Sequence, residues 1–102
     1  VLKAQEGDTE LTLKELAPVR LLKNKFYDEV KELYKKSPTK EQLVDLLGRA
    51  RAKRGMFEGD LDEGELEIGQ IAGLINTIKP AADIVREIMS DFNQEKINAA
   101  KL

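Results

Sequence analysis

Apolar side chains at helical spacing run through much of the chain. From Pro18 onwards they recur every three or four residues, which predicts an amphipathic helix that ends near Lys36. Thr39 and Gln42 have the spacing of a capping box, so a second helix is expected to follow and to end with Gly55 as its left-handed cap. The inward positions are Val19, Leu22, Phe26, Val30 and Leu33 in the first helix and Leu43, Leu46, Leu47 and Ala50 in the second.

The two ends of the chain show different patterns. Residues 9–13 alternate between polar and apolar after a Gly7-Asp8 turn signal, which predicts a short extended segment with too little after it to make a sheet. A final helix is expected from Pro80, and its polar continuation over residues 93–102 is expected to fray. The apolar face of this helix consists of Ala81, Ile84, Val85, Ile88, Met89 and Phe92.

Residues 64–74 form the most unusual stretch. Gly69 and Gly73 are four residues apart, so they share one helix face, although each glycine costs about 1 kcal/mol relative to alanine in a helix interior. Flanking isoleucines and leucines predict an element that is buried on more than one side. Two interpretations follow. The glycines allow another helix or strand to approach, or they let the backbone and Gln70 approach a ligand.

Composition excludes several functions. The chain has 102 residues, enough for one domain at most, and it contains no Cys and no His. Disulfides, thiolate zinc sites, imidazole ligands and His-dependent triads are therefore excluded. A net charge of −2 gives no general attraction to nucleic acid or to anionic membrane. With no long apolar run and no signal-peptide pattern, we expect a cytoplasmic protein that binds neither.

Two charged runs invite more specific hypotheses. The acidic turn from Glu58 to Glu65 fails the calcium-loop template. Counted from Asp60, the sixth position is Glu65 where glycine is required and the twelfth is Ile71 where glutamate is required, so no metal site is predicted. Nothing in the pattern predicts a buried carboxylate with a raised pKa there. The basic run from Arg49 to Arg54 is explained by cations at a helix end, which is favoured over nucleic-acid binding.

Three motifs, taken in order, resemble the C-terminal end of a flavin-dependent enzyme family. They are Gly59–Gly64, Ile68–Leu74 and Pro80–Ala82. The family joins the FMN-type enoyl-acyl-carrier-protein reductases with the nitronate monooxygenases, formerly 2-nitropropane dioxygenases. Val1–Ala4 with Asp8-Thr9 is similar to the family's exit from its barrel, and Val19–Asn24 to the following helix. The resemblance therefore covers nearly the whole chain.

The resemblance implies a mostly α subdomain of about four helices with a short extended N-terminal segment. Such a subdomain is normally appended to a TIM barrel, which is absent from this chain. Residues 1–14 would be the barrel exit and linker, and residues 15–102 the helical cap over the active-site mouth. The chain begins at Val1 without Met, so we expect a fragment of the enzyme.

In the reductase branch of the family, NAD(P)H reduces FMN and the flavin passes hydride to the C=C bond of an enoyl thioester. In the other branch a nitronate is oxidised with O₂. The family's phosphate-binding glycines and catalytic His belong to the barrel. We therefore expect the parent to be an enzyme, and the fragment to contain no catalytic residue and to bind no cofactor. The expected partners are the barrel, an acyl-carrier-protein-linked or small-molecule substrate, and further copies of the chain in a homo-oligomer.

Only Gly69 and Gln70 match the family's segment near the flavin and substrate cleft, so these two are the predicted cofactor-binding residues. Glu67 and Ile68 stand where relatives often have apolar or aromatic residues. The reductase branch is favoured over the monooxygenase branch. The alternative from another class is a free-standing helical module that binds proteins through its apolar helix faces.

Overall fold

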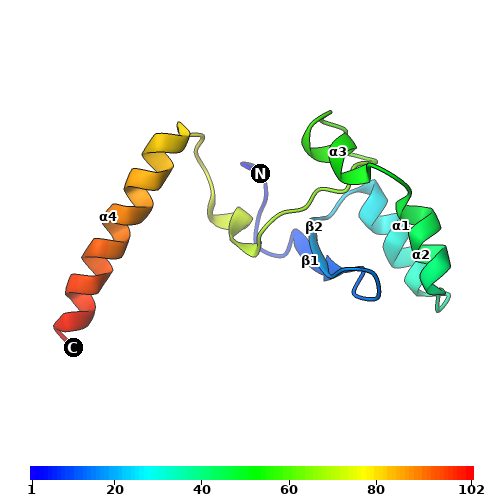
Figure 1. Cartoon of the computed structure of the whole chain (residues 1–102), viewed down its shortest axis with the longest axis horizontal. Helices are drawn as coiled ribbons and strands as arrows, with labels where there is room; N and C mark the ends of the chain where they lie inside the picture. Colours follow the sequence, from blue (N-terminus) through cyan, green and yellow to red (C-terminus); the bar gives the residue numbers. More distant parts are fainter.

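A computed structural model describes all residues from Val1 to Leu102. It shows a small hairpin, a group of short helices and a long C-terminal helix (Figure 1). The predicted mostly helical fold with a short extended N-terminal segment is confirmed. The elements are β1 (Thr9–Thr12), β2 (Val19–Leu22), α1 (Lys25–Tyr34), α2 (Lys40–Leu47), α3 (Arg51–Met56), the 3₁₀ helix η1 (Gln70–Leu74) and α4 (Ala81–Ala100).

The hairpin corrects the predicted start of the first helix. Val19–Leu22 is not helical but forms β2, which pairs antiparallel with β1 in a register that joins Thr9 to Leu22. The prediction that β1 lacks a partner is therefore also wrong. The helix begins only at Lys25, because the Asn24 side chain caps it by accepting a hydrogen bond from the backbone N–H of Tyr27 at 2.9 Å.

The second edge of β2 is also occupied. The N–H of Leu22 donates to the carbonyl of Leu66 at 2.9 Å, and the N–H of Ile68 donates to the carbonyl of Arg20 at 3.0 Å. Residues 66–68 thus add a short third segment along β2, with an isolated bridge between Leu21 and Glu67. This pairing fixes the chain just before the glycine stretch.

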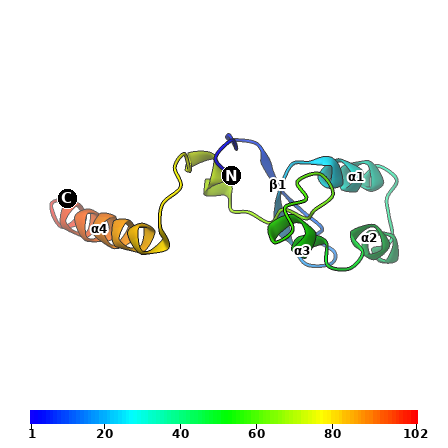
Figure 2. The same ribbon diagram turned by 90° about the horizontal axis from the view of Figure 1, so that it is seen from above.

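The core lies between the hairpin and the helices α1 and α2. Figure 2 shows these elements gathered with α3 at one end of the molecule. Five side chains with at most 2% of their surface exposed form this core: Leu13, Leu21, Phe26, Val30 and Leu43. Burial of apolar surface from both strands and helices therefore stabilises this half of the chain.

The capping box of the second helix is confirmed. The N–H of Gln42 donates to Thr39 Oγ1 at 3.2 Å, and the N–H of Thr39 donates to Gln42 Oε1 at 2.8 Å. The helix ends earlier than predicted, however. Gly48 has a φ of 66° and Ala50 a φ of 58°, so the chain turns sharply after Leu47.

The basic run forms the separate helix α3 instead of the end of the second helix. Arg51 still satisfies the carbonyls at the end of α2, because its Nε donates to Leu47 O at 3.0 Å and its Nη2 to Leu46 O at 2.7 Å. Gly55 lies inside α3 and is buried, so it is not the predicted left-handed cap.

Gly55 is glycine for a different reason. A Cβ atom at Gly64 would lie 2.3 Å from the Cα of Gly55, and a Cβ atom at Gly55 would lie 2.6 Å from Leu66 Cδ2. The backbone of α3 and the backbone of the acidic turn are therefore in direct contact. Of the glycines in the chain, this pair makes the closest approach.

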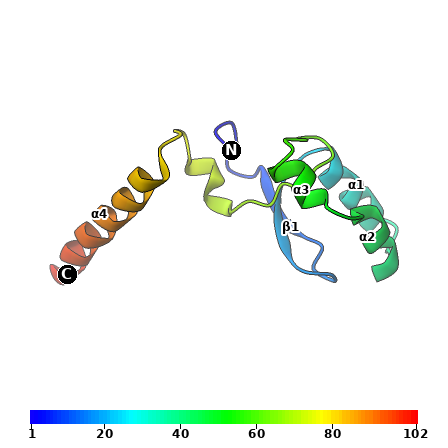
Figure 3. The ribbon, with the colours of Figure 1, turned by 45° about the horizontal axis from the view of Figure 1, so that its top comes forward.

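The helix α4 stands apart from the rest of the chain in all three views, as Figure 3 shows again from an intermediate angle. It contains no buried residue. The predicted helix from Pro80 is confirmed, and its polar continuation is helical as far as Ala100. None of the helices is both long enough and apolar enough to span a membrane.

The division predicted at residues 14 and 15 falls in the connection between β1 and β2. A barrel exit over residues 1–14 and a helical cap over residues 15–102 remain a prediction.

Candidate functional site

The glycine stretch is not an α-helix. Gly69 is extended, with φ −78° and ψ 155°, and a single 3₁₀ helix covers Gln70–Leu74. Because Ile68 is still hydrogen-bonded to Arg20 of β2, the chain cannot coil before Gly69. The turn is closed by bonds from Ala72 N to Gly69 O and from Ile75 N to Ala72 O, both 3.1 Å long.

The stretch is also less buried than predicted. Ala72 is 1% exposed, whereas Ile71 is 62% and Leu74 is 75% exposed. Gln70 lies at the surface, so its amide has no need of a buried hydrogen-bond partner within the chain. The prediction of an element buried on more than one side is wrong for this chain.

The two glycines of the stretch differ in their surroundings. A Cβ atom at Gly73 would lie 3.0 Å from the backbone nitrogen of Glu6 and 3.1 Å from the carbonyl carbon of Gln5. A Cβ atom at Gly69 would have its nearest neighbour, Ile71 Cγ2, at 3.8 Å, which is an ordinary contact. The close-packing interpretation therefore holds for Gly73 and not for Gly69.

Gln70 contributes to an open pocket of about 540 Å³. The pocket lies between the N-terminal turn and η1, and it combines one carboxylate and one amide with apolar walls. Gly69 is not among the residues that line it. The lining residues are Glu6, Gln70, Ile71, Gly73 and Leu74.

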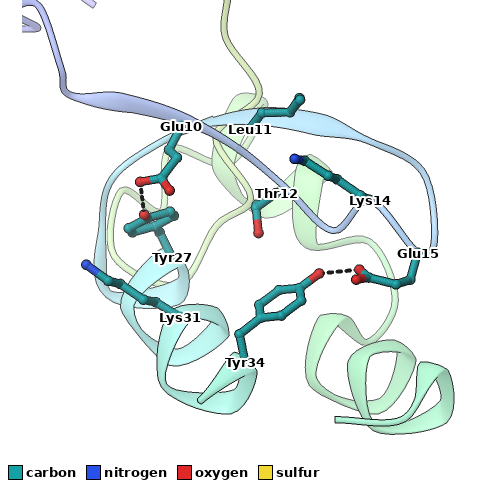
Figure 4. Close-up of a pocket in the computed structure, with 8 residues that line it drawn as sticks. All are labelled: Glu10, Leu11, Thr12, Lys14, Glu15, Tyr27, Lys31 and Tyr34. Carbon is teal, nitrogen blue, oxygen red and sulfur yellow. Dashed lines mark hydrogen bonds between the residues drawn. The ribbon is translucent and has the colours of Figure 1, made fainter. Parts of the chain in front are cut away.

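A second pocket, of about 350 Å³, lies between the hairpin and α1 (Figure 4). Within it the hydroxyl of Tyr27 donates a hydrogen bond to Glu10, and the hydroxyl of Tyr34 donates one to Glu15. Burial, together with the neighbouring carboxylate, raises the pKa of Tyr27 and of Tyr34 to about 12. The same hydrogen bonds lower the pKa of Glu10 and of Glu15.

These tyrosine–carboxylate pairs are not suited to proton transfer near neutral pH. The phenols stay protonated and the carboxylates stay ionised, and general acid–base catalysis needs a pKa close to the working pH. The pairs hold the hairpin to α1. No local pattern in the sequence indicates these pairs, because the partners are 17 and 19 residues apart.

The acidic turn is organised by its own backbone. Asp60 Oδ1 accepts hydrogen bonds from the N–H groups of Glu63 at 2.9 Å and of Asp62 at 3.2 Å, while Asp60 Oδ2 pairs with Arg54 at 2.7 Å. The bond from the Glu63 N–H and the pairing with Arg54 lower the pKa of Asp60. No cluster of carboxylates in the chain has the geometry of a metal site.

Glu65 is the exception in this turn. Glu65 is only 7% exposed. Burial raises the pKa of its carboxyl group, the charge of Glu67 raises this pKa further, and the charge of Arg51 opposes the increase. A buried carboxylate with a raised pKa was not predicted here. It follows from the contact between Gly55 and Gly64, which draws the next residue under α3.

No family model matches the chain. No curated protein matches it either. Solved structures do match, and two of them are structures of FabK, an FMN-dependent enoyl-acyl-carrier-protein reductase II. FabK from Thermotoga maritima is 33% identical over 97% of this chain, with a TM-score of 0.78. An M276A mutant of the same FabK is also 33% identical over 97% of the chain, with a TM-score of 0.69.

The chain is thus a FabK-like region, and the predicted resemblance to the family of this FMN-dependent enoyl-acyl-carrier-protein reductase II is confirmed. It spans about a third of the structures that it matches, 32% of FabK and 29% of the mutant chain. The assignment of Gly69 and Gln70 to a cofactor site remains a prediction.

Proposed function

We propose that this chain is the C-terminal cap of an FMN-dependent enoyl-acyl-carrier-protein reductase. In that role it covers the flavin and substrate cleft of a TIM barrel and has no catalytic activity alone. The observation that carries the proposal is the match to FabK over 97% of the chain at 33% identity. The chain contains no His and no Cys, and the tyrosines of the pocket between the hairpin and α1 are not suited to proton transfer near neutral pH. Both observations agree with catalysis by residues of the barrel.

The residues around Gln70 fit one wall of such a cleft. The amide of Gln70 offers both a donor and an acceptor at the surface of the pocket of about 540 Å³, as the polar edge of a flavin or a thioester carbonyl requires. Gly69 has an extended backbone with space beside it, so a ring can approach closely.

The same residues do not fit the phosphate of FMN. The pocket beside Gln70 contains no Lys or Arg, and it includes the carboxylate of Glu6. The phosphate would therefore be held by the barrel. Bound FMN would supply the hydride chemistry, accepting hydride from NAD(P)H and delivering it to the C=C bond. This chain would position the ring or the thioester and exclude water.

Exposed apolar surface marks the side on which we place the barrel. Leu74 and Ile78 are 75% and 85% exposed, and the apolar face of α4 is uncovered along its length. Contiguous exposed apolar surface of this kind is typical of an interface. The barrel is the proposed main partner, with an acyl-carrier-protein-linked or small-molecule substrate in the cleft and a homo-oligomer as the assembled state.

The decisive experiment uses the complete gene product. NAD(P)H oxidation is measured with a short enoyl thioester and, in parallel, O₂ consumption with a nitronate. We expect oxidation that depends on the thioester and a flavin spectrum of the purified enzyme. Turnover of the nitronate alone would assign the chain to the nitronate monooxygenase branch. A flavin-free product without either activity would support the protein-interaction module instead.

A further inference from the structure

We propose that Gly73 is a positioning residue for Gln70. Gly73 lets the N-terminal turn of residues 5–8 pack directly on η1, and this contact sets where the Gln70 amide lies in the cleft. The inference rests on the proposed function, since it assumes that Gln70 contacts flavin or substrate. It goes further by assigning a role to Gly73 and to the turn.

The first observation is the contact itself. The missing Cβ of Gly73 would lie 3.0 Å from Glu6 N and 3.1 Å from the carbonyl carbon of Gln5. Both are backbone atoms, so no side-chain rotation relieves the overlap. Gly73 does not have a positive φ, so the contact, and not the local backbone conformation, accounts for glycine here.

The second observation is that the turn is fixed to the hairpin. Within the turn, the N–H of Gln5 donates to Asp8 Oδ2 at 2.8 Å and the N–H of Asp8 donates to Gln5 O at 3.1 Å. The N–H of Lys23, directly after β2, donates to Asp8 O at 2.8 Å. The turn therefore offers η1 a fixed surface and does not move freely with it.

The third observation is the geometry of η1. A 3₁₀ helix has three residues per turn, so side chains at positions i and i+3 are superimposed along its axis. Gln70 and Gly73 stand in this relation. Glu6 borders the same pocket as Gln70 because it packs on the bare position of Gly73.

These contacts hold η1 from two sides. The Ile68 N–H to Arg20 O bond holds the chain before Gln70, and the turn holds the chain after it. A methyl group at position 73 would push η1 from the turn by a few tenths of an ångström. Gln70 would move with it, because it lies one turn away on the same short helix.

The test uses the complete enzyme with Gly73→Ala, Gln70→Ala and the double variant. We expect Gly73→Ala to raise the KM for the enoyl thioester about tenfold, since a misplacement of about 1 Å can cost about 100-fold and the shift expected here is smaller. In the Gln70→Ala background the same substitution should raise the KM no further, because the group that Gly73 positions is gone. Thr77→Ala, an exposed position beyond η1, is the control and should leave the KM unchanged.

The outcomes separate the two proposals. If Gln70→Ala leaves the KM and the FMN affinity unchanged, the assignment of Gln70 to the cleft is overturned. If Gln70→Ala has its effect and Gly73→Ala adds its full effect to it, only the positioning role is overturned.

A second pair of variants covers the case in which Gly73→Ala fails to fold. Asp8→Ala removes the acceptor for Gln5 N and loosens the turn, whereas Asp8→Asn keeps an acceptor oxygen at that position. We expect a raised KM for Asp8→Ala and recovery in Asp8→Asn. An unchanged KM in Asp8→Ala would overturn the inference.

Discussion

Residues 9–66 and residues 69–102 differ in how much of their apolar surface the chain itself covers. In the first region, hairpin and helices bury Leu21 and Phe26 completely, both at 0% exposure. In the second region α4 has no buried residue, and Phe92 is 58% exposed. Both regions contain amphipathic helices. A helical period therefore identifies an apolar face but does not reveal whether the chain itself covers it.

The largest expected effect is on stability, and it compares one phenylalanine from each region. Phe26→Ala should reduce the free energy of unfolding by about 3–5 kcal/mol, because it empties a filled core position. Phe92→Ala should change it by less than about 0.5 kcal/mol in the 102-residue chain, as for surface positions generally. Urea denaturation measures both. A similar loss for the two variants would contradict the division into a covered and an uncovered region.

The next effect tests the backbone contact that closes the first region. Gly64→Ala places a methyl group 2.3 Å from the Cα of Gly55 and should cost about 1–3 kcal/mol, as overpacking does. Gly69→Ala meets only an ordinary 3.8 Å contact and serves as the control for stability. Thermal unfolding of both variants measures the difference. Equal midpoints would show that α3 and the acidic turn can separate without cost.

Because the apolar surface of the second region is uncovered, we expect the isolated chain to associate as its concentration rises. Ile88 and Phe92 lie on one exposed face of α4, at 61% and 58% exposure, and this face should bind other copies when no barrel covers it. Ile88→Lys should shift the chain towards monomer, while Asn93→Lys, which adds the same charge at an exposed polar position, should not. Sedimentation velocity over a range of concentrations measures this. A strict monomer at high concentration would count against an open interface.

The smallest expected effect is a pH dependence of stability that comes from Glu65 in the covered region. Burial raises the pKa of Glu65 in the folded chain, so the folded state binds its proton more tightly than the unfolded state does. The resulting stability is present below the ordinary Glu pKa of 4.5 and is lost as the pH rises through the folded pKa. Glu65→Gln should remove this part of the pH dependence. The difference between the two unfolding curves from pH 4 upwards isolates it from the other carboxylates, and a constant difference would contradict it.

Local signals in the sequence predicted the elements that depend on neighbouring residues. The capping box at Thr39, the extended segment at Thr9 and the helix after Pro80 all follow from short-range patterns, and all are confirmed. The spacing from Val19 through Leu22 to Phe26 led to a wrong start for the first helix. Two residues of a strand and one of a helix happen to have the three-and-four spacing of a helix. Asn24, a strong capping residue, was the signal for the true start.

The features that were missed depend on contacts between distant residues. The burial of Glu65 follows from the approach of Gly64 to Gly55, and the conformation of the glycine stretch follows from pairing of residues 66–68 with β2. Neither contact produces a periodic pattern of apolar residues in the sequence. Of the site, the structure agrees with the close-packing interpretation of Gly73, but the packing partner is the turn at Gln5 and Glu6 and not a helix or strand.

The pairing of residues 66–68 with β2 also constrains the order of assembly. These hydrogen bonds close a loop that contains α1, α2 and α3, and the entropy of closing a long loop must be offset before such contacts form. We expect η1 to take its final place only after those helices have docked. The position of Gln70 therefore depends on the folding of α1, α2 and α3. Local unfolding of these short helices would also free residues 66–68 from β2, and with them η1 and Gln70.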